Sequence, residues 1–253
     1  MVSLQAQHTT TYTDAWFSLS SIYSFNEKWS LANEAHWRST HFLGNKEQFL
    51  LRPSVSYQAN KNKRFTLGYT FIQSNPYGEG ALAISVPEHN IWEQIILSYS
   101  INQHTLLHRL RLEQRFLGQP TALSKDQYQI ASYQFSNRIR YRMAWKASIT
   151  TKCFMHLYEE LWIATAADFS QPRYDRNWFY LGVGQRLTES GTIELAYLHQ
   201  NIAKSTEDYE RHPTVQLNFH YQLSKKNGNW RSGFVIDVGF SEGEWSKVRK
   251  HLS

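Results

Sequence analysis

The alternation of apolar and polar residues along most of the chain is the feature that most constrains its fold. Residues 214–223 are the clearest case, with five apolar side chains at odd positions and five polar side chains at even ones. Residues 64–71 repeat the pattern. Successive side chains of a β-strand point to opposite faces, so a period of two predicts strands with one apolar and one polar face.

About twelve segments carry this pattern, and no helical period of useful length lies between them. They are residues 15–25, 29–38, 49–57, 64–71, 91–101, 106–116, 135–146, 154–163, 178–187, 192–200, 214–223 and 230–240. Many approach the ~9–11 residues that a tilted transmembrane strand needs. The pattern predicts an all-β chain that forms one domain.

The composition of the chain excludes several classes of protein. No run approaches the ~18 consecutive apolar residues of a membrane-spanning helix. The mean hydropathy of −0.56 is polar, but a membrane β-barrel averages the same way because lipid-facing and lumen-facing residues alternate. The single Cys153 excludes an intrachain disulfide and a multi-cysteine zinc site. With 19% charged and 15% aromatic residues, the net charge of +6 does not indicate a nucleic-acid partner.

Arginines dominate the polar faces of two neighbouring strands, with Arg109, Arg111 and Arg115 on one and Arg138, Arg140 and Arg142 on the next. Stacked like charges repel unless carboxylates or an anionic ligand lie between them. A barrel interior supplies such partners from its opposing walls. Those available are Glu34, Glu113 and one of Glu159 and Glu160. A solvated basic face of a soluble β-sandwich remains the alternative.

The apolar faces favour the barrel, because no helix is predicted to cover them and a closed ring in lipid leaves no strand edge unpaired. Aromatic residues near strand ends fit the girdles that mark membrane interfaces. They are Trp16, Trp29, Tyr57, Trp92, Trp145, Trp178 and Trp230. We therefore predict a single antiparallel up-and-down transmembrane β-barrel of about twelve strands.

Short connections alternate with longer ones near residues 39–48, 73–90, 117–127, 165–177 and 201–213. This alternation is typical of outer-membrane barrels. Twelve strands in this order place both termini on the side of the long connections, the reverse of ordinary outer-membrane barrels. Either the strand count is wrong or the long connections face the periplasm. The predicted parts are an N-terminal segment 1–13, a barrel 14–240 and a tail 241–253, and segment 1–13 is either the remnant of an export signal or a plain N-terminus.

Several motifs in order resemble the bacterial family of unknown function numbered 2490. The most specific is the run from His108 to Phe116, with the sequence His-Arg-Leu-Arg-Leu-Glu-Gln-Arg-Phe. The others are Leu51-Arg52-Pro53, Leu67-Gly68-Tyr69, Glu88-His89 with Trp92, the 138–142 arginine run, Tyr158-Glu159-Glu160, Asp175-Arg176-Asn177, and Tyr197 with Gln200. The resemblance spans roughly residues 29–221. It implies an outer-membrane barrel of a kind common in Bacteroidota, with no established activity.

The sequence departs from this family at three places. Asn90 stands where a basic residue is expected after Glu-His, and Arg176-Asn177 replaces the more usual Gln-Asn-Arg order. The chain also continues past Phe240, so Phe234 to Phe240 is the expected closing strand.

Enzyme motifs are absent from the sequence: it holds no Gly-x-Ser-x-Gly, phosphate-binding glycine loop or His-Glu-x-x-His. A lipid-modifying hydrolase would have to use His89 or His104 with Ser98 or Ser100, whose spacing singles out none of them. The eleven histidines are scattered, so neither a metal nor another cofactor is predicted. A non-enzymatic protein is the preferred interpretation.

The residues predicted to line the lumen and to contact an anion are Arg109, Arg111, Arg115, Arg138, Arg140, Arg142, Glu113, Glu34, His36, Arg38, Arg52 and Glu160. They fit either an ion network that plugs the barrel or a narrow anion-preferring channel or small-ligand pore, since rings of arginine select anions. A third hypothesis is an accessory subunit of an envelope complex, docked through its loops or the basic tail 247–250. The expected partners are membrane lipid and lipopolysaccharide, envelope proteins and a small anionic ligand.

Overall fold

A closed ring of eleven strands forms the body of the molecule in the computed structural model, which describes residues 8–78, 82–125, 127–205, 207–226 and 229–232. The ring strands are β2 (Asp14–Ser24), β3 (Trp29–Thr40), β4 (Asn45–Asn60), β5 (Lys63–Ser74), β6 (Val86–Ile101), β7 (His104–Ser124), β8 (Gln127–Ser148), β9 (Cys153–Thr165), β10 (Arg173–Arg186), β11 (Gly191–Ala203) and β12 (Asp208–Lys226). Two short strands, β1 (His8–Thr11) and β13 (Asn229–Ser232), pair with β12. No helix of the described residues is long and apolar enough to cross a membrane.

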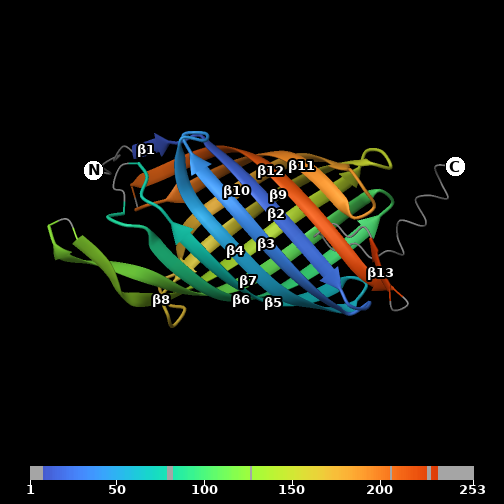
Figure 1. Ribbon diagram of the computed structural model, residues 1–253, viewed down its shortest axis with the longest axis horizontal. Helices are drawn as coiled ribbons and strands as arrows, with labels where there is room; N and C mark the ends of the chain where they lie inside the picture. The colour runs from blue at the N-terminus through green and yellow to red at the C-terminus, as the bar shows by residue number, and fades with distance from the viewer. Residues whose placement is uncertain (1–7, 79–81, 126, 206, 227–228, 233–253) are drawn as a thin grey trace, which may run out of the picture.

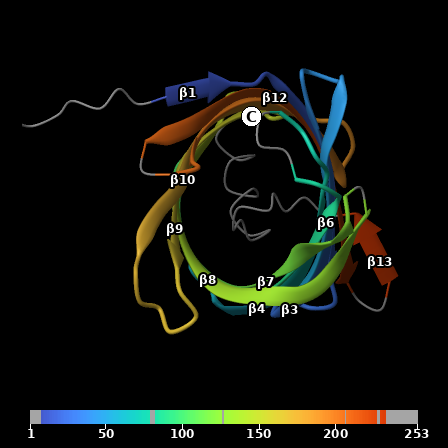
Figure 2. The same cartoon turned by 90° about the vertical axis from the view of Figure 1, so that its left-hand side faces the viewer.

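Each ring strand pairs antiparallel with the next, as an up-and-down barrel requires, and Figure 2 shows the closed ring along its axis. The ring closes where β12 pairs in parallel with β2, in a register that aligns Leu19 with Phe219. The all-β barrel is confirmed, and its single closed ring excludes the two-sheet sandwich. The predicted strand 230–240 does not join the ring as described: residues 230–232 belong to β13, and residues 233–240 lie outside the described part of the chain.

An odd number of ring strands makes the first and last run in the same direction. The chain therefore enters the ring at Asp14, beside the longer connections, and β12 ends at the opposite end, beside the short turns. The prediction that both ends of the barrel chain lie on the long-loop side is wrong for this ring, because it depended on an even strand count.

Two predicted long connections are mostly strand. β7 and β8 continue to Ser124 and Gln127 as a projecting hairpin, seen in green at the left of Figure 1, where residues 117–127 were expected to be a loop. β3 and β4 are joined by residues 41–44 alone instead of 39–48. The tip of the β7–β8 hairpin is exposed on both faces, so it lacks the one-sided burial that produces an alternating sequence.

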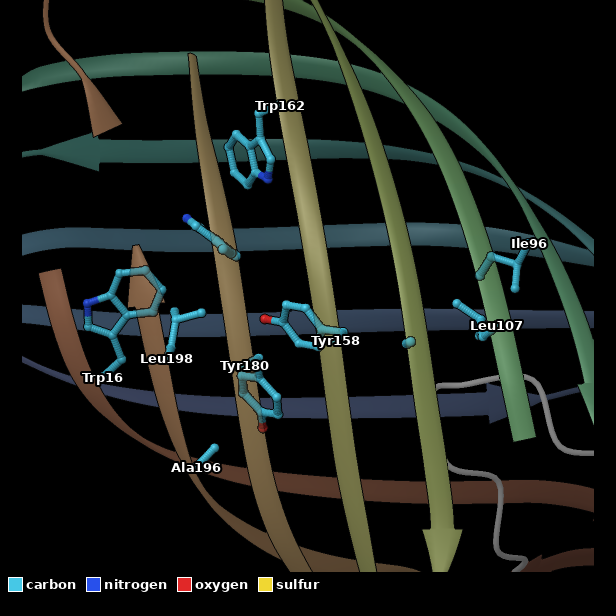
Figure 3. Packing of buried hydrophobic residues seen from close by; sticks show 10 residues of the cluster. Trp16, Ile96, Leu107, Tyr158, Trp162, Tyr180, Ala196 and Leu198 are labelled. Atoms are coloured by element: carbon cyan, nitrogen blue, oxygen red, sulfur yellow. The ribbon is translucent and has the colours of Figure 1, made fainter. Parts of the chain in front are cut away.

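The barrel is apolar outside and polar inside. Phe17, Leu19 and Val215 are about half exposed on the outer wall, whereas Arg140 and Glu160 are buried. This polarity is the reverse of a water-soluble domain and is that of a transmembrane barrel, whose outer wall meets lipid. Tyr158, Trp162 and Tyr180 project from neighbouring strands into the interior, together with Trp16 (Figure 3).

The predicted aromatic girdle is only partly outside. Trp29 is exposed and packs on Tyr57, with 4.9 Å between ring centroids, and Trp145 stacks on the exposed His104. The side chain of Trp230 lies outside the described part of the structure.

Trp16, Trp92 and Trp178 are buried, so their assignment to a girdle is wrong. Residues two positions apart on a strand face the same side, and each of these tryptophans belongs to the inward-facing set of its strand. A polar lumen accepts tryptophan because an arginine can pack on the ring: the guanidinium of Arg38 lies 3.9 Å from the Trp16 ring centroid.

Candidate functional site

The register of β7 and β8 brings basic side chains directly opposite one another inside the barrel. Arg109 pairs with Arg142, and Arg111 pairs with Arg140. Like charges in opposed positions destabilise a sheet, so this part of the wall needs carboxylates from the same interior face. Two glutamates provide them.

Glu160 of β9 is the acceptor for three arginines. Its side chain is fully buried. It accepts hydrogen bonds from Arg109 Nη2 at 2.5 Å, from Arg140 Nε at 2.8 Å and from Arg142 Nη2 at 2.6 Å. The neighbouring Glu159 is exposed and accepts from Asn177 Nδ2 at 2.7 Å. The structure therefore selects Glu160 as the lumen partner.

Glu113 of β7 is the acceptor for the neighbouring arginines. Arg138 Nε donates to it at 2.8 Å and Arg140 Nη1 at 2.6 Å, while Arg111 Nη1 lies 3.7 Å away. Arg140 thus bridges the two buried carboxylates. Charge-assisted bonds of this kind are stronger than neutral ones and fix the guanidinium planes.

The other predicted residues lie in smaller groups on the same interior face. Glu34 accepts from Arg52 Nη1 at 3.0 Å and interacts with His36 at 3.1 Å. Arg38 donates to Gln48 at 2.7 Å. The structure thus places all twelve predicted residues inside the barrel, although it distributes them over several groups.

Two acidic partners were missed by the site prediction. Glu88 binds Arg115 in a bidentate pair at 2.7 and 2.8 Å. Asp175 lies 3.4 Å from Arg138. Both come from strands other than those of their arginines, and a single sequence carries no signal for strand pairing at that distance.

Aromatic rings cover the guanidinium groups. Arg140 lies 3.6 Å from the Trp162 ring centroid, and Arg142 lies 3.9 Å from that of Tyr158. Arg111 lies 3.9 Å from the Trp92 ring, which itself rests on Gly68: a Cβ on that glycine would come within 2.1 Å of the indole. The absence of a side chain at Gly68 is thus what lets Trp92 reach Arg111.

A cavity of about 150 Å³ lies in the lumen beside this network. Six of its lining residues are basic and two are acidic. The basic ones are Arg38, Arg52, Arg109, Arg140, Arg142 and Lys146, and the acidic ones are Glu34 and Glu194. A low-dielectric wall strengthens such a charge excess, so the geometry suits a small anion.

Sequence reasoning missed the part of the cavity wall around Glu194. This carboxylate accepts from the hydroxyl of Tyr180 and contacts His156 Nδ1 at 3.2 Å. Tyr180 in turn accepts from Asn218 Nδ2 at 3.0 Å. The alternating pattern does predict that these residues face inward. They are neutral or isolated in the sequence, however, so they form no cluster of charges that would mark them as a site.

A second group of contacts lies at the long-loop end of the barrel. Tyr77, in the connection between β5 and β6, contacts Tyr12 with 5.6 Å between ring centroids and donates to Glu210 at 3.4 Å. His212, fully buried beside them, interacts with Asp14 at 2.7 Å. These contacts join the β5–β6 connection to the β12 side of the ring.

The candidate hydrolase residues do not form a site. His89 interacts with Tyr69, and His104 stacks on Trp145, both on the outer wall. Ser98 is buried and Ser100 interacts with Thr105, both on the inner face. Within the described ranges, no group of three or more His, Cys, Asp or Glu side chains could hold a metal ion.

Comparison with known proteins gives a family and a distant likeness to other barrels. The family described as Protein of unknown function (DUF2490) matches residues 13–211. The β-domain of the Bordetella autotransporter BrkA is 10% identical with a TM-score of 0.39, covering 76% of this chain and 79% of its own. The NanC porin is 9% identical with a TM-score of 0.43, covering 75% and 87%. No functionally curated protein matches the sequence.

Proposed function

This chain belongs to the DUF2490 family, whose function is unknown, so its geometry is the starting point: we propose that it is a narrow, anion-preferring channel or small-ligand pore of the bacterial outer membrane. The apolar outer wall contacts membrane lipid and lipopolysaccharide, and solutes pass through the polar interior. The protein carries out no chemical step on them.

The observation that carries the proposal is the cavity in the lumen, with six basic and two acidic lining residues. Rings of arginine and lysine select anions in pores, because they replace part of the hydration that an anion loses in a narrow passage. The cavity also lies within a ring whose outer wall is apolar, which supports a route for solutes along the barrel axis.

The buried carboxylates have a supporting role in this mechanism. Glu113 and Glu160 are almost completely buried behind the arginines and do not line the cavity. They offset the repulsion among the guanidinium groups and hold these groups in position. Arg109 and Arg142 line the cavity, so the positive charge that the two carboxylates do not offset faces it. A fixed positive wall of this kind attracts anions without requiring any conformational change.

Single-channel recording from the purified protein in a planar bilayer tests the proposal. We expect a small steady conductance in the wild type, and a smaller chloride current in the double variant Arg109→Gln, Arg142→Gln, because both side chains line the cavity. The matched control is Arg115→Gln. Arg115 is an inward arginine that lies outside the cavity and pairs with Glu88, so this variant should conduct like the wild type.

A bilayer that stays silent with protein shown to be inserted and folded would overturn the channel. The remaining function would then be that of an accessory subunit, and a stoichiometric partner should appear after mild detergent extraction. Equal loss of current in Arg115→Gln and in the double variant would instead show that the cavity is not the selective element.

A further inference from the structure

The lumen cavity has two chemically different walls. Its basic residues come from β3, β4, β7 and β8. The strands that form the seam of the ring, β2 and β12, contribute a neutral polar wall of Ser18, Ser20, Gln216, Asn218 and His220. In the ring order, β7 and β8 lie across the barrel from this seam. A solute between β7–β8 and the seam therefore meets four basic side chains on one side and hydroxyl, amide and imidazole groups on the other, with Arg38 and Arg52 beside the seam on β3 and β4.

The neutral wall is held in place by its own hydrogen bonds. Gln216 Nε2 donates to Asn218 Oδ1 at 2.7 Å, and Asn218 Nδ2 donates to the Tyr180 hydroxyl at 3.0 Å. Ser20 Oγ lies 2.6 Å from His220 Nδ1. These groups combine donors and acceptors in fixed positions, which is the arrangement that recognises the hydroxyl groups of a ligand.

Several buried polar atoms of the cavity-lining residues have no hydrogen-bond partner within the described structure. Three of them are the donors Arg38 Nε, Arg109 Nε and Trp178 Nε1. The other two are the ring nitrogens His36 Nδ1 and His156 Nε2, whose donor or acceptor role depends on the tautomer. Buried polar groups are normally paired, because leaving one unpaired costs free energy. The residues that line the cavity thus carry polar groups whose hydrogen-bonding capacity the described protein groups do not fully use.

The aromatic residues and the size of the cavity limit the ligand further. Tyr158 and Tyr180 line it as a parallel stack, with 4.4 Å between ring centroids and 8° between ring planes, and Trp16 and Trp178 line it as well. Its volume of about 150 Å³ is below the ~300–1,000 Å³ of drug-sized sites. This size favours a ligand no larger than one sugar unit.

We propose that the cavity is a binding site for a small hydroxylated carboxylic acid with a single ring, of the sugar-acid class. The carboxylate lies against Arg109 and Arg142, and the hydroxyl groups face Asn218, Gln216 and Ser20. This inference rests on the proposed function, since it names the solute class that the same lumen would pass. Binding is measured separately from conduction.

Isothermal titration of the folded protein in detergent tests the site with three matched probes. Glucuronate carries the ring, the hydroxyl groups and the carboxylate, glucose lacks the carboxylate, and cyclohexanecarboxylate lacks the hydroxyl groups. We expect glucuronate to bind at least about tenfold more tightly than either of the others, because each lost set of hydrogen bonds is worth about that factor. Glucuronate binding no tighter than cyclohexanecarboxylate, or no binding of any probe, would overturn the proposal.

Single substitutions test the contribution of each wall to binding. Arg142→Gln should weaken glucuronate about tenfold and leave glucose unchanged, because only the charge-assisted contact is lost. Asn218→Ala should weaken glucuronate and glucose but not cyclohexanecarboxylate. Arg115→Gln, outside the cavity, should leave all three unchanged. If the barrel conducts chloride but binds the three probes equally, the channel proposal stands and the sugar-acid site is overturned. If the barrel is silent but still distinguishes the probes, only the channel proposal is overturned.

Discussion

At the scale of single residues, Glu160 is the side chain on which most of the lumen depends. It accepts from three arginines and is fully buried, so no water can replace it. Removing the carboxylate of a buried ion pair leaves the cation without compensation, which is far more costly than losing a surface pair.

Glu160→Gln should therefore lower the free energy of unfolding by about 3–5 kcal/mol. Urea unfolding in lipid vesicles measures it. The matched control is Glu159→Gln, one residue away on the outer wall, where removal of a charge from a lipid-facing position should leave the stability unchanged or raise it. Equal losses in the two variants would contradict the role given to Glu160.

Gly68 is the second residue with a specific prediction. Gly68→Ala drives a Cβ into the Trp92 indole, and overpacking of this kind costs about 1–3 kcal/mol. The same urea unfolding experiment should show the loss. Gly191→Ala is the control, because the nearest atom there is the Thr188 hydroxyl at 3.0 Å, the end of a small side chain. If Gly68→Ala unfolds like the wild type, Trp92 is not held against the strand.

The identity of the lumen residues could be predicted from sequence, but their pairing could not. Arg109 and Arg140 stand out because they belong to charged runs at alternate positions. Their shared partner Glu160 was one of two adjacent glutamates, and only the strand register decides which of them faces inward. Trp16 and Trp178 were misplaced because aromatic composition favours the membrane interface, whereas packing against arginine favours the interior.

At the scale of elements, the strands were predictable wherever one face meets lipid and the other the lumen. The extension of β7 and β8 was not, because both of its faces are exposed and the sequence there does not alternate. Removal of one-sided burial removes the period-two signal. We therefore expect that the barrel does not depend on the hairpin tip for its folding.

Replacement of residues 121–129 by a two-residue turn should leave the barrel folded, because residues 121–125 and 127–129 are exposed. The measurement is the mobility shift on heating in a detergent gel, which folded barrels show. The shift temperature should match that of the intact protein. A barrel that no longer folds would show that the hairpin contributes to assembly.

At the scale of the whole molecule, the parallel seam between β2 and β12 is what turns the sheet into a ring. It follows from the odd number of strands, and the sequence did not reveal it because β-pairing between residues about 200 positions apart has no local signature. The seam also contributes the neutral wall of the cavity.

A disulfide test examines the seam directly. Leu19→Cys with Phe219→Cys, in a Cys153→Ser background, places two outward cysteines in register on adjacent strands, which are about 4.8 Å apart in a sheet. We expect a crosslink on mild oxidation in the folded protein. The pair Leu19→Cys with Val215→Cys, four positions out of register, should not form one. Crosslinking of the second pair instead would place β12 in another register.

A fixed excess of arginine and lysine should make the lumen prefer anions. The zero-current potential across a bilayer under a potassium chloride gradient measures this preference. We expect a potential with the sign of chloride diffusion, reduced in the double variant Arg109→Gln, Arg142→Gln and unchanged in Arg115→Gln. A potential with the sign of potassium diffusion would contradict it, because the six basic residues that line the cavity would then not control what passes.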